Sequence, residues 1–164
     1  MEQQVLFTAG ADGYHSYRIP ALLATAGGRL LAFCEARRHS RADTGDIDIA
    51  LRCSDDGGAT WDAMRIIADA GPDVLGNPCP VQDRATGRIW LPLNWNRATG
   101  GEDLILAGAA PRGVRLMYSD DEGASWSPPV DITAQVKRPD WTWYATGPGH
   151  GIQLRTGRLL IPCD

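Results

Sequence analysis

The stretch SDDGGATW, from Ser54 to Trp61, returns almost unchanged as SDDEGASW from Ser119 to Trp126. Repetition at an interval of tens of residues is typical of folds built from stacked supersecondary units. In each copy one Asp is suited to accept hydrogen bonds within its own turn, and a Gly can adopt positive φ without strain. A calcium-binding loop needs acidic ligands at more positions and a distal Glu. We therefore interpret both copies as structural turns that fasten the fold.

A second repeat consists of a Gly-Arg pair followed by an apolar run. It occurs as GGRLLAF (27–33), TGRIWLP (86–92) and TGRLLIP (156–162). Each run follows another apolar stretch and a turn of small residues, which predicts a β-hairpin. The stretches DIDIALRCS (46–54) and GVRLMYS (113–119) then predict strands that lead into the two SDD turns.

The order of hairpin, strand, turn and strand therefore occurs twice and begins a third time. No stretch shows a helical period over three turns. Units of about four strands joined by turn-rich links predict an all-β fold in which each unit is one blade of a β-propeller. One blade cannot bury both of its faces alone, so the blades must stack around an axis.

Composition excludes several classes of function. The net charge is −4 and there is no long basic run, which argues against nucleic acid and anionic membranes as partners. No apolar run is long enough for a membrane span. The N-terminal MEQQVLF has neither a basic nor an apolar leader segment, so we expect a cytoplasmic protein if this is the true start. The four cysteines form no CxxC pair and are expected to be small buried hydrophobes.

The motif YRIPALL (17–23) makes the pattern more specific. With the two SDD turns, GNPCPV (76–81) and TGPGHGIQL (146–154), it resembles the sialidases (exo-α-sialidases, neuraminidases), in which the repeated turn is the Asp-box or BNR repeat. The resemblance extends from about Gly13 to Asp164. It implies a six-bladed β-propeller of the sialidase type, of which residues 1–164 supply roughly the first two to three blades as one partial domain.

A complete propeller at this repeat length needs roughly 350 residues or more. We therefore expect the chain to be the N-terminal portion of a longer enzyme and to be inactive alone. The resemblance implies that the enzyme hydrolyses terminal α-linked sialic acid from sialylated glycans with retention. A Tyr nucleophile, its Glu partner and two further arginines are then expected beyond the chain. No metal or cofactor is implied.

The resemblance assigns roles to three charged residues. Arg18 is the first of three arginines that bind the substrate carboxylate, a task suited to the planar guanidinium; by itself it could equally be a surface Arg with an exposed head. Asp43 lies two dozen residues after Arg18 and shortly before the predicted strand DIDIALRCS (46–54), and is expected to be the catalytic acid/base. Its rival Asp46 falls within that stretch, in which polar and apolar residues alternate. Arg37 is expected to contact a ring hydroxyl of the sugar, with Arg38 as its rival.

Four other residues have weaker claims. Asn77 either contacts the sugar or makes an Asx turn ahead of Pro78. Glu102 and Asp103 lie on a predicted Gly-rich loop between blades, where they either rim the pocket or are simply exposed. His150 is expected to have a structural role in a tight turn.

Two other functions remain open. One is a non-catalytic Asp-box propeller that binds a glycan or a protein. The other is a glycosidase of the same fold that acts on a related nine-carbon ulosonic acid.

Overall fold

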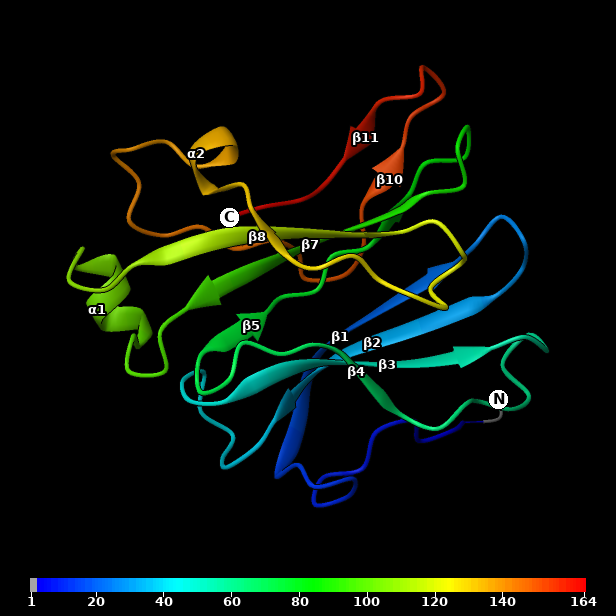
Figure 1. Ribbon diagram of the computed structural model, residues 1–164, viewed down its shortest axis with the longest axis horizontal. Helices are drawn as coiled ribbons and strands as arrows, with labels where there is room; N and C mark the ends of the chain where they lie inside the picture. Colours follow the sequence, from blue (N-terminus) through cyan, green and yellow to red (C-terminus); the bar gives the residue numbers. More distant parts are fainter. Residues whose placement is uncertain (1–2) are drawn as a thin grey trace.

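A computed structural model describes residues 3–164 and shows an almost entirely antiparallel β-structure (Figure 1). The first blade contains Ser16–Ala24 (β1), Leu30–Arg37 (β2), Ile47–Ser54 (β3) and Arg65–Ala68 (β4). The second blade contains Val74–Gly76 (β5), Val81–Gln82 (β6), Ile89–Asn96 (β7), Arg112–Ser119 (β8) and Val130–Asp131 (β9). A third blade begins with Ile152–Gln153 (β10) and Leu159–Leu160 (β11).

The first blade is a meander centred on β2, which pairs with β1 on one side and β3 on the other. The β2–β3 register runs without interruption from Arg37↔Ile47 to Leu30↔Ser54. All three predicted hairpins are present, and so are the strands predicted from DIDIALRCS and GVRLMYS. The strand expected to include Asp46 begins at Ile47, however, so Asp46 belongs to the preceding loop.

The inner edge of the second blade is divided into two short pieces. β5 pairs with one end of β7, and β6 pairs with the other. Pro78 and Pro80 lie between the pieces and have no N–H to donate to a ladder. One parallel bridge, Ile47↔Val74, connects the two blades at the inner edge.

The main core lies between these two blades, because each turns an apolar face toward the other. Phe33 and Leu31 of β2 are fully buried, as are Leu91 and Leu93 of β7. Trp126 from the second Asp-box packs against Phe33, with the ring centroids 5.7 Å apart. The second Asp-box therefore helps to attach its own blade to the one before it.

Both Asp-boxes have the expected internal hydrogen bonds. In the second, one oxygen of Asp121 accepts from the Ser119 hydroxyl and the Ser125 N–H, each at 2.8 Å, and the other accepts from the Ser125 hydroxyl at 2.5 Å. Asp56 makes the same set of contacts in the first box with Ser54 and Thr60. These bonds satisfy the turn internally, as a structural role requires.

Two expectations need correction. The predicted Gly-rich loop at Glu102 and Asp103 is a short helix, Glu102–Leu106 (α1), whose first turn holds both carboxylates. A second short helix is Thr133–Val136 (α2).

Three cysteines are buried as expected, but Cys163 is exposed because it lies near the open edge of the third blade. No helix in the described residues is long and apolar enough to span a membrane.

We predict that Asp121→Ala lowers the free energy of unfolding by about 2 kcal/mol, because three hydrogen bonds to one carboxylate are lost. The neighbouring change Asp120→Ala, which removes an ion pair with Arg88 at the surface, should lower the free energy of unfolding by less. Urea denaturation of both variants measures the difference. Equal losses would contradict the structural role of the box.

The stability difference between the parent protein and Asp121→Ala should depend on pH. Hydrogen bonds from the side chain and backbone of Ser125 lower the pKa of Asp121 from 3.8 to about 2. A carboxyl whose pKa is lowered by folding contributes stability above its unfolded pKa and loses it as the pH falls. The stability gap between the protein and Asp121→Ala should therefore narrow from about pH 4 to pH 2.

Candidate active site

A cavity of about 260 Å³ lies at one end of the innermost strands, where both blades and the segment leading to the third blade meet. It has a mixed lining of arginine, carboxylate, amide and apolar side chains. The lining residues are Arg18, Ile19, Glu35, Arg37, Asp43, Ile47, Val74, Asn77, Gly100, Glu102, Ile105, Arg112 and Trp143.

A bulge in β1 positions Arg18 at the cavity. Arg18 pairs with Glu35 across the sheet, but the register shifts between Arg18 and Ala21. Within the bulge, Ile19 has φ of 52°, which is unusual for a β-branched residue and costs about 1–3 kcal/mol. Bulges commonly redirect a side chain beside a functional site. The surrounding sheet therefore maintains backbone strain at the point where Arg18 enters the cavity.

A buried ion pair forms the floor of the site. Both Nε and Nη2 of Arg37 donate to Oε2 of Glu35, at 3.0 and 2.5 Å, and the two side chains are 2% and 4% exposed. Oε1 of Glu35 accepts the Asn77 N–H at 2.9 Å, which connects the first blade to the second. Burial alone lowers the pKa of Arg37, but Glu35 and Asp43 outweigh burial, and the net shift is upward. The guanidinium is therefore held in its charged form.

Asp43 lies on the loop between β2 and β3, with its side chain 67% exposed. Its Oδ1 accepts from Arg37 Nη2 at 2.6 Å and from Arg18 Nη1 at 3.0 Å. The carbonyls of Arg41 and Ala42 accept from Arg37 Nη1 at 2.6 and 2.9 Å, which fixes the backbone just before Asp43. Within residues 3–164 no hydrogen bond reaches Oδ2, so that oxygen is available to a ligand.

The structure thus brings Arg18, Arg37, Asp43 and Asn77 together at one cavity. The rivals Arg38 and Asp46 do not line it. Arg38 Nε instead donates to Asp46 Oδ2 at 2.9 Å, away from the cavity. Successive side chains of an extended chain point to opposite sides, which separates Arg37 from Arg38. The catalytic and binding roles of the four residues remain predictions.

The weaker candidates have different positions. Asn77 has φ of 51° and contributes its backbone N–H to the Glu35 carboxylate, and no Asx-type hydrogen bond from its side chain is found in the described part of the chain. Glu102 lines the cavity and Asp103 does not. His150 Nδ1 lies 2.8 Å from the Gly151 carbonyl, as expected for a local structural contact.

Three cavity residues were missed by sequence reasoning: Glu35, Arg112 and Trp143. Arg112 donates to the Tyr144 carbonyl at 2.7 Å and to Asn96 Oδ1 at 3.0 Å, and its guanidinium carbon lies 4.1 Å from the centre of the Trp143 ring. Burial lowers the pKa of Arg112. Like Arg18, Arg112 lies near the start of an apolar strand, and that position could have identified it.

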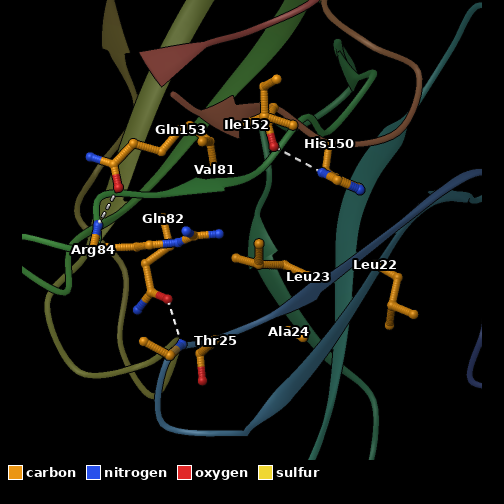
Figure 2. A pocket seen from close by; sticks show the side chains of 12 residues that line it. Leu22, Leu23, Ala24, Thr25, Val81, Gln82, Arg84, His150, Ile152 and Gln153 are labelled. Atoms are coloured by element: carbon orange, nitrogen blue, oxygen red, sulfur yellow. Dashed lines mark hydrogen bonds between the residues drawn. The ribbon is translucent and has the colours of Figure 1, made fainter. Parts of the chain in front are cut away.

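A second hollow, of about 530 Å³, lies at the opposite end of the innermost strands. Its lining comes from β1, β6 and β10 and includes Leu23, Val81 and Ile152 (Figure 2). Gln82 and Gln153 there accept backbone N–H groups from Ala26 and Arg84. No carboxylate lines this hollow within the described residues, whereas Glu35, Asp43 and Glu102 line the first cavity.

Comparison with known proteins gives a consistent result. The model of the BNR repeat-like domain family matches residues 28–164. An "Exo-alpha-sialidase" of Aspergillus fumigatus is 40% identical over 92% of this chain and 41% of its own length. An "Exo-alpha-sialidase" of Arthroderma benhamiae is 36% identical over 95% of this chain and 42% of its own length. The solved structure of Hadza microbial sialidase Hz136 superposes with a TM-score of 0.85 at 34% identity, covering 94% of this chain and 33% of that one.

The chain therefore belongs to the family of BNR repeat-like domains, and its relatives by sequence and by structure are sialidases. The expected partial β-propeller of the sialidase type is confirmed, with a sheet that does not close on itself. The chain spans about two fifths of the length of its fungal relatives.

We predict that Glu35→Gln destabilises the fold by about 3 kcal/mol, because the buried Arg37 loses its closest anionic partner. Glu102→Gln is the matched control, since Glu102 lines the same cavity but is exposed. It should change the unfolding free energy by about 0.5 kcal/mol or less. Urea denaturation of both variants measures the two changes in unfolding free energy. Equal changes would contradict the conclusion that the Glu35–Arg37 ion pair stabilises the fold.

Proposed function

We propose that the protein of which this chain is part is an exo-α-sialidase, which hydrolyses terminal α-linked sialic acid from glycoconjugates. The observation that carries this proposal is the exposed Asp43 carboxylate, held through one oxygen by Arg18 and Arg37 at the cavity. The sialidase relatives that match more than nine tenths of this chain support it. The substrate is a sialylated glycan.

The arrangement suits an anionic sugar that carries a carboxylate on its anomeric carbon. Arg18 is 39% exposed at the cavity and can present two N–H groups to that carboxylate. Arg37 is buried and anchored by Glu35, so it can offer a fixed charge without moving. Asn77 is the residue assigned to contact the remainder of the sugar. The contact expected for Arg37 requires one of its N–H groups to change partner, because all five already donate to Glu35, Asp43 and the two loop carbonyls.

Asp43 acts as the acid and then as the base. In the first step it donates a proton to the glycosidic oxygen as the bond from that oxygen to the anomeric carbon breaks, while a Tyr outside residues 1–164 bonds to the carbon and gives its phenolic proton to its Glu partner. In the second step Asp43 accepts a proton from water, whose oxygen replaces the Tyr and gives the retained sugar, and the Glu partner returns the proton to the departing Tyr oxygen. A neutral Tyr avoids the repulsion that a carboxylate nucleophile would meet from the substrate carboxylate.

The 164-residue chain is inactive alone under this proposal, because it includes Asp43 and Arg18 but not the nucleophile. The remaining blades supply the Tyr, its Glu partner and two more arginines. They also cover the apolar side chains exposed at the open edge of the partial propeller, such as Leu160.

The test is hydrolysis of a fluorogenic α-sialoside by the protein expressed from its full reading frame. We predict that Asp43→Ala lowers kcat by about 10²- to 10⁴-fold, the usual contribution of a positioned acid/base. Asp55→Ala is the control, because Asp55 lies in the first Asp-box turn, is 72% exposed in an ion pair with Arg29, and does not line the cavity. It should retain the activity of the parent.

A folded parent protein that hydrolyses no α-sialoside would reject the enzymatic proposal. Sialic acid binding that depends on Arg18 would then favour a non-catalytic glycan-binding propeller. Full activity in Asp43→Ala would reject the role of Asp43 alone and leave the sialidase assignment intact.

A further inference from the structure

A polar cluster lies behind the loop that carries Asp43, on the side away from the cavity. Its members are Tyr14, Arg38, Asp46 and Asp48, and none of them lines the cavity. Arg38 is at its centre, with Nε donating to Asp46 Oδ2 at 2.9 Å and Nη2 donating to Asp48 Oδ2 at 2.9 Å. Nη2 also lies 3.0 Å from the Tyr14 hydroxyl, which donates to Asp48 Oδ2 at 2.6 Å.

This cluster holds both ends of the loop. Arg38 is the first residue after β2, and Asp46 is the last before β3. Their backbones are also joined, because the Arg38 N–H donates to the Asp46 carbonyl at 3.1 Å. Asp48 is on β3 with its side chain fully buried, so the guanidinium is anchored to the sheet. The Tyr14 ring lies under the guanidinium carbon, 4.6 Å from it.

We infer that Arg38, held by Asp46 and Asp48, is a positioning residue that fixes the Asp43 loop for catalysis. This inference rests on the proposed function of Asp43. The neighbouring Arg37 holds the same loop from the cavity side through the Arg41 and Ala42 carbonyls. The two consecutive arginines therefore restrain one loop from opposite sides, and Asp43 lies between the two points of attachment.

The cluster is poorly explained by stability alone. Burial raises the pKa of Asp48 to about 6, and nearby Asp69 and Asp46 add to the rise, against opposing effects of the Tyr14 hydrogen bond and Arg38. A carboxyl whose pKa is raised by folding makes the protein less stable as the pH increases through that range. Oδ1 of Asp46 and Oδ1 of Asp48 are also buried without a hydrogen-bond partner among the described residues. Asp48 is fully buried, while Arg38 and Asp46 are 36% and 20% exposed. We take the incompletely satisfied carboxylates as support for a geometric role of the cluster.

The first test is the change Arg38→Met in the protein expressed from its full reading frame, assayed on a fluorogenic α-sialoside. We expect kcat to fall by about 10- to 100-fold, since a small displacement of a catalytic group is enough for such a loss. KM should stay within about twofold, because Arg18 and Arg37 are unchanged. Arg52→Met is the matched control, since Arg52 also contacts a carboxylate (Asp12) and an aromatic ring (Phe7), but its side chain makes no hydrogen bond to residues 38–46 in the described part of the chain. It should leave kcat unchanged.

A double-mutant cycle with Asp43→Ala separates positioning from a general loss of structure. If Arg38 acts through Asp43, Arg38→Met should have no further effect on kcat once Asp43 is absent. A loss of the same size in both backgrounds would overturn the inference. So would an unchanged kcat in the single variant Arg38→Met.

Hydrogen exchange tests the same inference without an activity assay. The Gly45 N–H donates to the Ala98 carbonyl at 3.0 Å and the Ala42 N–H to the Ser40 hydroxyl at 3.2 Å, so both report on the loop. Arg38→Met should accelerate exchange at these two amides, and Arg52→Met should not. If the parent protein hydrolyses no sialoside, the proposed function fails, and exchange alone decides whether Arg38 holds the loop. Unchanged exchange in Arg38→Met would overturn that too.

Discussion

The structure of the site depends on one buried charge, the guanidinium of Arg37. A cation that is 2% exposed must find anions and acceptors nearby, because burial of an unpaired charge is prohibitively costly. Glu35 supplies the buried anion, Asp43 a second one, and two loop carbonyls accept the remaining donors. Since Glu35 also accepts the Asn77 N–H, the same charge determines how the inner edge of the second blade approaches the first.

The outer turns and the inner strand ends have different structural roles in this fold. The Asp-boxes lie at the outer turns, and the carboxylate of each box is hydrogen-bonded within its own turn. Trp126 adds an apolar contact between blades, although its buried Nε1 has no hydrogen-bond partner among the described residues. The inner strand ends instead carry unusual backbone, with positive φ at Ile19 and Asn77, and side chains that need partners from other strands. The Asp-boxes and the Trp126 contact hold the blades together at the outer turns. The inner strand ends can therefore retain backbone strain without loss of the fold.

The outer turns could be predicted from the sequence more fully than the contacts at the inner strand ends. The hairpins and the Asp-boxes could be predicted because their residues interact within a few positions of each other. Arg18, Arg37 and Asp43 were reached only through the resemblance to sialidases, and geometry now places them at one cavity. Glu35 pairs with Arg37 only two residues away, but its contact with Asn77 spans 42 residues. The contact of Arg112 with the Tyr144 carbonyl spans 32 residues. No local pattern specifies such contacts.

Under the proposed function, the free site already holds an internal carboxylate where the substrate carboxylate must bind. Arg18 Nη1 donates to Asp43 Oδ1 at 3.0 Å, yet Arg18 is also the residue assigned to grip the sugar. Substrate binding must therefore draw Arg18 away from Asp43. Asp43 then keeps Arg37 as its cationic partner within this chain. A loop held only through Arg18 would move when that bond is exchanged. Attachment through Arg37 on one side and Arg38 on the other allows Arg18 to change partners while Asp43 stays in place.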